Sequence, residues 1–169
     1  MTPRLLAPAD LPGLLAVQRA CYGDGLLESA AVYARRLAGS ANASLVIARD
    51  GQVLAYLAAY RSQLGKVTPL HGDFEPAATP DAIYLHDMAV LPVCAGQGLA
   101  HALLATLRAQ AVAAGLRHGA LVSVQGSQSY WQRQGFAVQA LQDEEQRRRL
   151  AGYGADAVYM TADLCASSS

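Results

Sequence analysis

The sequence predicts an α/β protein folded as one domain over residues 1–165. Two patterns predict this class. Leu85–Leu91 is a short, mostly apolar run ended by Pro92, which is typical of a strand covered on both faces. From residue 97 onward, apolar residues recur at helical spacing until Gly115 closes the run. A chain of 169 residues is also long enough to bury most of its apolar surface in one core.

The N-terminal part is expected to form a strand, two helices and a hairpin. Asp10 is placed to cap the first helix, and Asp50-Gly51 between two apolar runs is a strong signal for a hairpin turn. These elements are expected at Arg4–Ala7 (strand), Leu11–Tyr22 and Glu28–Leu37 (helices), and Ser44–Arg49 and Val53–Arg61 (hairpin strands).

Residues 62–81 show no periodicity and contain three prolines. A loop of this length in a compact domain is usually either disordered or functional. We expect a flap on the substrate side of the molecule, with a mere surface insertion as the alternative.

The C-terminal part is expected to add strands and short helices. A strand at Ala120–Gln125 is followed by a short helix that begins near Gly126 and runs through Gln134. The remaining expected elements are a strand opened by Gly135-Phe136, a solvated loop or short helix face at Gln142–Arg149, a closing strand at Ala157–Leu164 and a frayed tail at Ala166–Ser169.

The charge balance argues against several classes of partner. The formal net charge is zero and no basic block stands out, so neither nucleic acid nor an anionic membrane surface is expected as a partner. No apolar run approaches the roughly 20 residues of a spanning helix, and the first residues lack the apolar segment of a signal peptide. Three cysteines without a Cys-x-x-Cys pair predict neither a disulfide framework nor a metal site. We expect a cytoplasmic protein, either a monomer or a homodimer.

Gly96 and Gly98 form a tight turn between the predicted strand and the long helix. A helix that begins there points unpaired N–H groups and the positive end of its dipole into the turn, which suits a phosphate or pyrophosphate. The turn lacks the Lys-Ser/Thr pair of a P-loop and the three-glycine dinucleotide fingerprint. An ordinary strand-turn-helix without a ligand is the alternative.

Two motifs carry a resemblance to a known family. Val90-Leu91-Pro92-Val93-Cys94-Ala95-Gly96-Gln97-Gly98-Leu99-Ala100 resembles the acetyl-CoA signature of the GNAT N-acetyltransferases, an apolar strand and Val-x-Pro exit followed by Arg/Gln-x-x-Gly-x-Gly/Ala. Tyr130-Trp131-Gln132-Arg133-Gln134-Gly135-Phe136 resembles the second GNAT motif. Both motifs in order are more specific than either alone, and with the hairpin the match spans nearly the whole chain. The sequence departs from the family pattern at Ala95, Val124 and Trp131.

The resemblance implies the GNAT fold, a mixed, mostly antiparallel sheet of about six or seven strands that is splayed at the cofactor site and flanked by about four helices. It implies acetyl-CoA as the acyl donor, without a metal. The pantetheine arm would pair with Met88, Ala89 and Val90, in the gap beside the strand that holds Ser123. The pyrophosphate would lie on the glycine turn. The residues expected around the tail and the sulfur are Ala95, Gly96, Gln97, Gly98, Leu99, Ala100, His101 and Trp131.

Acetyl transfer to an amine needs a base, because an alkylammonium with a pKa near 10 is almost fully protonated at pH 7. His86 stands where the family often has a Glu or His base, and imidazole titrates near neutrality; a structural histidine is the alternative. The backbone N–H of Met88 would polarise the thioester carbonyl. Strict alternation would place Tyr84, His86, Met88 and Val90 on one face of the strand, and Leu85, Asp87 and Ala89 on the other. Asp87 is therefore expected to be a structural carboxylate.

Other residues are weaker candidates. The family's usual acid, a tyrosine, is replaced by Trp131, whose indole N–H cannot release a proton, although a thiolate can leave without an acid. Tyr130 lies about 100° around the helix and could act as the acid only in an irregular helix; core packing is its alternative. Tyr22, Glu28 and Tyr84 are candidates for the acceptor pocket, with ordinary structural positions as the alternative.

We therefore expect an acyl-CoA-dependent N-acetyltransferase. It would move an acetyl group from acetyl-CoA to a primary amine of a small molecule or peptide, by direct attack in a ternary complex. A non-catalytic acyl-CoA-binding regulatory module of the same fold is one alternative, made plausible by the three departures from the family pattern. A different nucleotide binder that uses the same glycine turn is the other.

Overall fold

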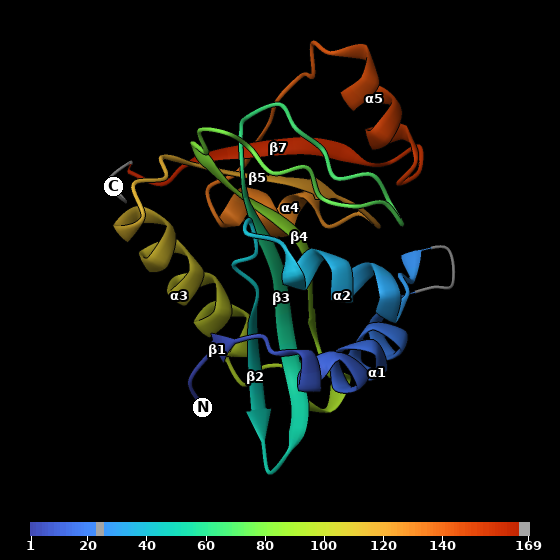
Figure 1. Ribbon diagram of the computed structural model, residues 1–169, viewed down its shortest axis with the longest axis vertical. Helices are drawn as coiled ribbons and strands as arrows, with labels where there is room; N and C mark the ends of the chain where they lie inside the picture. Colours follow the sequence, from blue (N-terminus) through green and yellow to red (C-terminus); the bar gives the residue numbers. More distant parts are fainter. Residues whose placement is uncertain (23–25, 166–169) are drawn as a thin grey trace.

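A twisted sheet runs through the molecule, as the computed structural model shows for residues 1–22 and 26–165 (Figure 1). Within these residues the sheet has seven strands in the order β1-β2-β3-β4-β5-β7-β6. All neighbouring strands are antiparallel except β4 and β5, which are parallel, so the expected mixed, mostly antiparallel sheet is confirmed. The strands are β1 (Arg4–Leu5), β2 (Leu45–Arg49), β3 (Gln52–Ser62), β4 (Ala82–Val90), β5 (His118–Ser123), β6 (Ala137–Val138) and β7 (Val158–Asp163). The predicted tail, Ala166–Ser169, lies outside the described residues.

Helices cover both faces of the sheet. The helices within the described residues are α1 (Leu11–Cys21), α2 (Ala30–Ala38), α3 (Leu99–Ala113), α4 (Gln128–Arg133) and α5 (Glu144–Ala151), with short 3₁₀ turns at Pro8–Asp10 and Pro92–Cys94. Helices α1 and α2 lie on one face of β3 and β4, and α3 lies on the other (Figure 1). The charged run that was expected to be a loop or a short helix face forms α5. None of the described helices is both long and apolar enough to cross a lipid bilayer.

The core is divided between these two faces by the alternation of side chains along β3. Leu57 and Ala59 pack toward α3, together with Leu103 and Leu107 of that helix. Tyr56 and its alternate neighbours face the other way, toward α1 and α2. Burial of one apolar stripe from each helix against the sheet therefore holds the layers together.

The hairpin of β2 and β3 turns at Asp50 and Gly51, as the sequence predicts. Both residues have positive φ, 52° and 78°, which is the backbone required by a two-residue type I′ turn. This turn matches the right-handed twist of the flanking strands, and it fixes the register of β3 against β2.

The starts of the first two helices differ from the expectation. The side chain of Asp10 does not cap α1. It accepts two hydrogen bonds of 2.8 Å from Arg4 and one of 2.8 Å from the backbone N–H of Ala7. Ser29 caps α2 by accepting a hydrogen bond from the N–H of Val32, so Glu28 lies just outside the helix instead of in its first turn.

The central strand β4 contains a β-bulge. In the ladder with β3, Ala58 is paired with Asp87, but the next residue, Ala59, is paired with Leu85. His86 is therefore an extra residue in β4 that has no opposite partner.

The bulge makes the expected alternation along β4 wrong. His86 and Asp87 both contact side chains on the α1–α2 side of the sheet, where Tyr84 also lies. Met88 packs into the core on the α3 side. The extra residue shifts the phase of the strand by one position, so two polar side chains that should point apart lie on the same face.

The pairing of β4 with β5 ends at Leu85. Beyond this residue, β4 is hydrogen-bonded to β3 alone. The N–H of Leu91 donates to the carbonyl of Leu54 on β3, and hydrogen-bonded pairs alternate along an antiparallel ladder. The backbone groups of Met88 and Val90 consequently point away from β3, toward the side that β5 has left.

Candidate active site

A cleft opens where β4 and β5 part. Its cavity measures about 240 Å³ and passes between the end of β4 and helix α4. The lining residues include Met88 from β4, Val122 from β5, and Tyr130 and Trp131 from α4. The ring of Trp131 packs edge-on against Phe136, which fixes it as part of the wall. The structure thus brings together the central strand and the aromatic pair of the second sequence motif.

The glycine turn lies at the end of β4 and opens helix α3. Gly98 is the residue before the helix and has a φ of 79°, as has Gly96, and an added Cβ at either position would meet no atom within 4 Å. No side chain caps the helix. The first N–H groups of α3 therefore remain available to an anion, in the place where Gln97, Leu99, Ala100 and His101 were expected to contribute.

Side chains from the end of α1 cover two carbonyls on the open edge of β4. The hydroxyl of Tyr22 donates to the carbonyl of Met88 at 2.9 Å, and the thiol of Cys21 donates to that of Val90 at 3.2 Å. The N–H groups of Met88 and Val90 lie on the same edge, past the last residue paired with β5. An extended chain lying in the cleft could accept hydrogen bonds from them as an added strand would.

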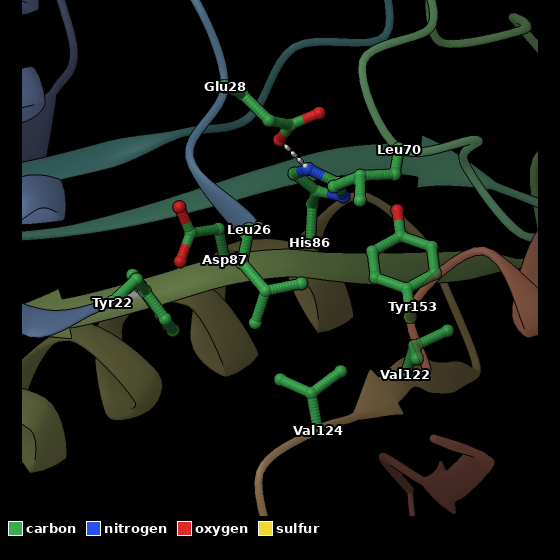
Figure 2. A pocket seen from close by; sticks show the side chains of 9 residues that line it. All are labelled: Tyr22, Leu26, Glu28, Leu70, His86, Asp87, Val122, Val124 and Tyr153. Atoms are coloured by element: carbon green, nitrogen blue, oxygen red, sulfur yellow. Dashed lines mark hydrogen bonds and ion pairs between the residues drawn. The ribbon is translucent and has the colours of Figure 1, made fainter. Parts of the chain in front are cut away.

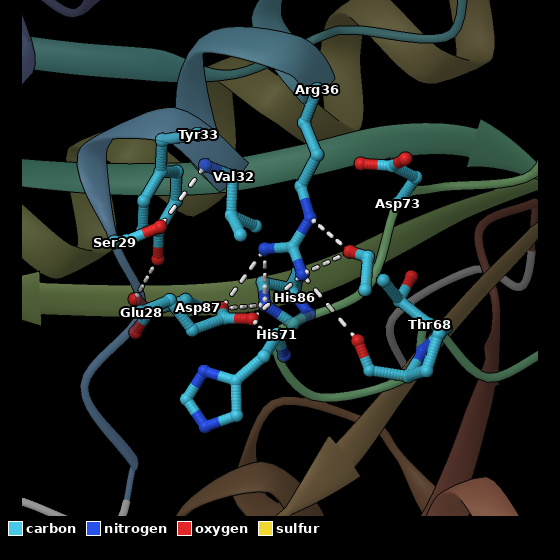
Figure 3. Close-up of polar contacts among 12 residues, drawn as sticks. Glu28, Ser29, Val32, Tyr33, Arg36, Thr68, His71, Asp73, His86 and Asp87 are labelled. Carbon is cyan, nitrogen blue, oxygen red and sulfur yellow. Dashed lines mark hydrogen bonds and ion pairs between the residues drawn. The ribbon is translucent and has the colours of Figure 1, made fainter.

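A buried cluster of charged and polar side chains lies beside the cleft (Figure 3). Nε2 of His86 lies 2.5 Å from Oε1 of Glu28 and 3.0 Å from Nη1 of Arg36. The three side chains are at most 2 % exposed. The carboxylate oxygen can only accept and lies closer to Nε2 than the guanidinium does, and Nη1 of Arg36 also donates to that same oxygen, so the hydrogen is assigned to Nε2. The other ring nitrogen, Nδ1, is buried and has no hydrogen-bond partner among the described residues.

Glu28 is the centre of this cluster. Its Oε2 accepts a hydrogen bond of 2.6 Å from Arg36 and one of 2.8 Å from the backbone N–H of His71. Burial alone raises the pKa of the Glu28 carboxyl, but the charge and hydrogen bonds of His86 and Arg36 outweigh burial, so the pKa lies below its usual range. Glu28 is thus an ionised carboxylate with both oxygens occupied, which suits it to hold His86 in place.

Asp87 belongs to a second polar group. Its Oδ2 accepts hydrogen bonds from the hydroxyls of Tyr33, at 2.6 Å, and Tyr56. Burial, reinforced by the charge of Asp87, raises the pKa of both tyrosines well above the usual value, so both hydroxyls keep their protons and act as donors. The other oxygen, Oδ1, accepts no hydrogen bond from the residues that the structure describes.

A small chamber adjoins the inner end of the cleft and shares several of its walls (Figure 2). Its volume is about 40 Å³. His86 and Asp87 rise into it from the same face of β4, with Val122 and Val124 opposite (Figure 2). The complete lining is Tyr22, Leu26, Glu28, Leu70, His86, Asp87, Val122, Val124 and Tyr153. Tyr84, by contrast, is 1 % exposed and packs in the core behind the chamber.

Residues 62–81 form the outer side of the chamber and are held down by polar contacts. Arg36 donates to the carbonyl of Gly72 at 2.7 Å, and the hydroxyl of Tyr153 donates to the carbonyl of Thr68 at 2.5 Å. Phe74 stacks on Tyr60 with ring centres 4.6 Å apart. The segment contributes Leu70 to the chamber.

Several residues of the chamber were not predicted from the sequence. Arg36, Leu70 and Tyr153 come from a helix, a loop and the segment after α5, and no local motif links them. Asp87 was assigned to the opposite face because the bulge was not foreseen. The spacing of Glu28 and Arg36, eight residues apart on either side of a helix start, is the one signal that could have suggested an ion pair.

Known proteins of one family resemble this chain in sequence and in fold. The profile of the Acetyltransferase (GNAT) family matches residues 12–136. No curated protein is similar enough in sequence to be matched. The ribosomal-protein-S18-alanine N-acetyltransferase from Escherichia coli shares 16% identity at a TM-score of 0.69, over 99% of this chain and 96% of that one. The GphF GNAT-like decarboxylase, in complex with isobutyryl-CoA, shares 17% identity at a TM-score of 0.72, over 97% and 100%.

A third structure is similar in sequence as well. A GNAT family acetyltransferase from Brucella melitensis, in complex with acetyl-CoA, shares 26% identity at a TM-score of 0.57, over 80% of this chain and 81% of that one. The fold similarities extend over nearly the whole chain, and the matched family segment contains the cleft-forming part of β4, the glycine turn and α4. The chain therefore belongs to the GNAT acetyltransferase family.

Proposed function

We propose that the protein is an N-acetyltransferase that moves the acetyl group of acetyl-CoA to a primary amine of a small molecule or peptide, by direct attack in a ternary complex. The observation that carries this proposal is the end of the β4–β5 ladder at Leu85. It leaves the N–H groups of Met88 and Val90 on an open edge of β4, and Met88 lines a cavity of about 240 Å³ that leads to His86.

The cleft and the glycine turn suit the two ends of an acyl-CoA. Met88 and Val90 offer donors to an extended pantetheine arm, with Ala89 between them facing the core. The glycine turn and the uncapped start of α3, from Gly98 to His101, offer backbone N–H groups to a pyrophosphate, whereas the N–H of Gln97 donates to the carbonyl of Cys94 within the turn. Ala95 leaves this backbone cradle intact, because the cradle needs no side chain. When bound, acetyl-CoA supplies an activated carbonyl carbon.

His86 is the residue that takes the proton from the amine. Glu28 holds the Nε2–H, so Nδ1 presents a lone pair, and that atom has no hydrogen-bond partner among the described residues. The attacking amine must be unprotonated, and an imidazole is a suitable base near neutral pH. The carboxylate of Glu28 also stabilises the imidazolium that forms, as an acidic partner does in other histidine bases.

The remaining groups stabilise charge and shape the cleft. The N–H of Met88 points to where negative charge grows on the carbonyl oxygen as the C–N bond forms. The C–S bond then breaks, and the thiolate, with a pKa of about 8.5, leaves without an acid. Trp131 is a wall of the cleft. Burial raises the pKa of Tyr130, so its hydroxyl is a poor proton donor at pH 7, and water supplies the final proton.

The direct test is a screen for release of the CoA thiol from acetyl-CoA over a panel of primary amines. The His86→Gln variant should lose about 10²–10⁴-fold in turnover, because the base is removed and the amide cannot replace it. Acetyl-CoA should still raise the melting temperature of this variant as it does that of the parent, which shows that the cleft is intact. An unchanged pH–rate profile in the variant would remove His86 from its assigned role.

A non-catalytic acyl-CoA-binding module is the second candidate, favoured by the departures at Ala95, Val124 and Trp131. It predicts a melting-temperature increase with acetyl-CoA but no thiol release with any amine. Stabilisation by ADP but by neither acetyl-CoA nor desulfo-CoA would instead select a different nucleotide binder.

A further inference from the structure

The residues that line the chamber indicate which kind of amine is the acceptor. This inference rests on the proposed function. We propose that the acceptor is a primary amine on a short apolar stem, with no carboxylate next to the amine, and that Asp87 is the residue that selects it. Three observations support this: one oxygen of Asp87 is open, the nearby Arg36 is fully enclosed by its partners, and the rest of the chamber lining is apolar.

Asp87 offers one carboxylate oxygen to a ligand. Its Oδ2 is occupied by the hydroxyls of Tyr33 and Tyr56, which fix the orientation of the carboxylate. Its Oδ1 accepts no hydrogen bond of normal geometry from the described residues: the nearby Tyr22 hydroxyl, whose pKa is raised by burial and by the charge of Asp87, donates to the carbonyl of Met88. Asp87 lines both the chamber and the cleft. A carboxylate with one oxygen anchored and the other open is suited to accept a charge-assisted hydrogen bond from an ammonium group.

The nearest cation cannot serve a carboxylate of the acceptor. The side chain of Arg36 is fully buried, and its three nitrogens donate to Glu28 and to the carbonyls of Pro69 and Gly72. Glu28 and Arg36 balance each other, so Asp87 contributes the net charge among the described residues that line the chamber. This charge attracts an ammonium group and repels a carboxylate.

The rest of the chamber lining is either apolar or consists of hydroxyl groups that already donate to backbone carbonyls. The apolar side chains in the lining are those of Leu26, Leu70, Val122 and Val124. The hydroxyls of the two lining tyrosines donate elsewhere, that of Tyr22 to the carbonyl of Met88 and that of Tyr153 to the carbonyl of Thr68. A carboxylate in this space would lose its hydration without gaining a donor, whereas an alkyl or aryl stem would be favoured. The volume of about 40 Å³ limits the stem to a few heavy atoms beyond the cleft.

The bulge places the selecting group beside the base. Asp87 Oδ1 binds the incoming ammonium, one of its protons passes to Nδ1 of His86, and the neutral nitrogen then attacks the thioester carbonyl. The C–N bond forms and the C–S bond breaks, and the second proton lost by the attacking nitrogen passes through water to the leaving sulfur. The products are an amide, the CoA thiol and an imidazolium that returns its proton to solvent. Asp87 gains and loses no proton in these steps, so its effect falls on acceptor binding.

The test uses pairs of amines that differ by one carboxylate. Propylamine is compared with 2-aminobutanoic acid, and butylamine with 2-aminopentanoic acid, by thiol release from acetyl-CoA. The carboxylate-bearing member of each pair should have a kcat/KM lower by about 10²-fold or more, because its charge is desolvated without a partner. The Asp87→Asn variant should raise the KM of the preferred amines about 10- to 100-fold, with a smaller change in kcat. Asp73→Asn is the matched control: this aspartate pairs with Arg35 on the surface, and its loss should leave the KM unchanged.

A second variant keeps Asp87 and its two tyrosine contacts. Val124→Arg adds a cation to the half-buried wall opposite, and it should narrow or reverse the preference within each pair. The inference is overturned, with the proposed function still standing, if the carboxylate-bearing amines react as fast as their partners or if Asp87→Asn leaves the KM unchanged. The proposed function itself fails if no amine of either kind releases thiol, whether or not acetyl-CoA raises the melting temperature.

Discussion

The two halves of β4 differ in their pairing with neighbouring strands and in their side chains. In the first half, Ala82–Leu85, every residue has a paired residue on the strand at each side, and the side chains are apolar or aromatic and at most 6 % exposed. In the second half, from His86 to Val90, the strand is paired on one side, and two polar side chains lie on one face. The first half belongs to the core of the protein, and the second half lines the proposed active site.

The difference shows how a site can be made inside a sheet without a long loop. Ending one ladder at Leu85 exposes backbone donors, and adding one residue at His86 turns two polar side chains toward the same chamber. Pairing with β3 continues on both sides of the extra residue, so the polar groups stand on a backbone that is held before and after the bulge. Groups supported in this way are better fixed in position than groups on a loop.

The largest effect on stability is expected from the ion pair that supports the second half. Arg36→Met removes the cation from Glu28 and leaves a buried carboxylate without its partner, which should cost about 3–5 kcal/mol of unfolding free energy. Denaturation in urea measures the loss. Arg35→Met, one residue earlier and paired with Asp73 on the surface, should change the free energy by less than about 1 kcal/mol. Equal losses in the two variants would contradict the central role of the buried pair.

A core substitution in the first half should reduce stability without reducing catalysis. Ile83 is 2 % exposed, and Ile83→Ala should cost about 2–5 kcal/mol by leaving a cavity. Thiol release per folded molecule, measured below the melting temperature, should stay close to that of the parent. Val138→Ala at the exposed end of the sheet provides the comparison, with an expected change below about 0.5 kcal/mol. A parallel fall in turnover would mean that the two halves are not separable.

The acid dependence of stability should report on Glu28. Its pKa is below the usual value in the folded protein, so its contribution to stability is present above a pH of about 4.3 and is lost as the pH falls through the folded-state pKa. In Glu28→Gln this contribution is absent at every pH, and the slope of unfolding free energy against pH should be shallower below about pH 4, by up to about 1.4 kcal/mol per pH unit. Parallel slopes for parent and variant, measured by urea denaturation at a series of pH values, would refute this role.

The smallest effect is expected at the open edge of β4. Tyr22→Phe removes the hydroxyl that donates to the carbonyl of Met88, which should cost about 1 kcal/mol. The hydroxyl of Tyr130 has no hydrogen-bond partner among the described residues, so Tyr130→Phe should be nearly neutral. Thermal denaturation of both variants compares them directly, and a larger loss in Tyr130→Phe would reverse the assignment.

The strand, turn and helix at the proposed cofactor end could be predicted from the sequence, because they are contiguous. The strand, the turn with Gly96 and Gly98, and the helix after them follow one another within about 30 residues, and each is specified by local backbone requirements. The hairpin at Asp50-Gly51 was predictable for the same reason.

The acceptor end could not be predicted, because tertiary contacts determine it. Leu70 and Tyr153 are more than 80 residues apart in sequence and meet only in the folded chamber. The phase of β4 depends on a bulge whose signal lies in the pairing with β3, not in the strand's own residues. Asp10 was likewise expected to cap α1. Its carboxylate instead accepts hydrogen bonds from Arg4, a contact that the residues of the helix start do not reveal.

The bulge at His86 also makes the chemistry of the chamber sensitive to chain length. If one residue were deleted between Tyr84 and Met88, the regular two-residue repeat would return and a single polar side chain would face the chamber. A gain or loss of one codon in this strand would thus exchange a paired base and carboxylate for one of them alone. Insertions and deletions, and not only substitutions, are therefore a route by which this scaffold could acquire or lose acceptors.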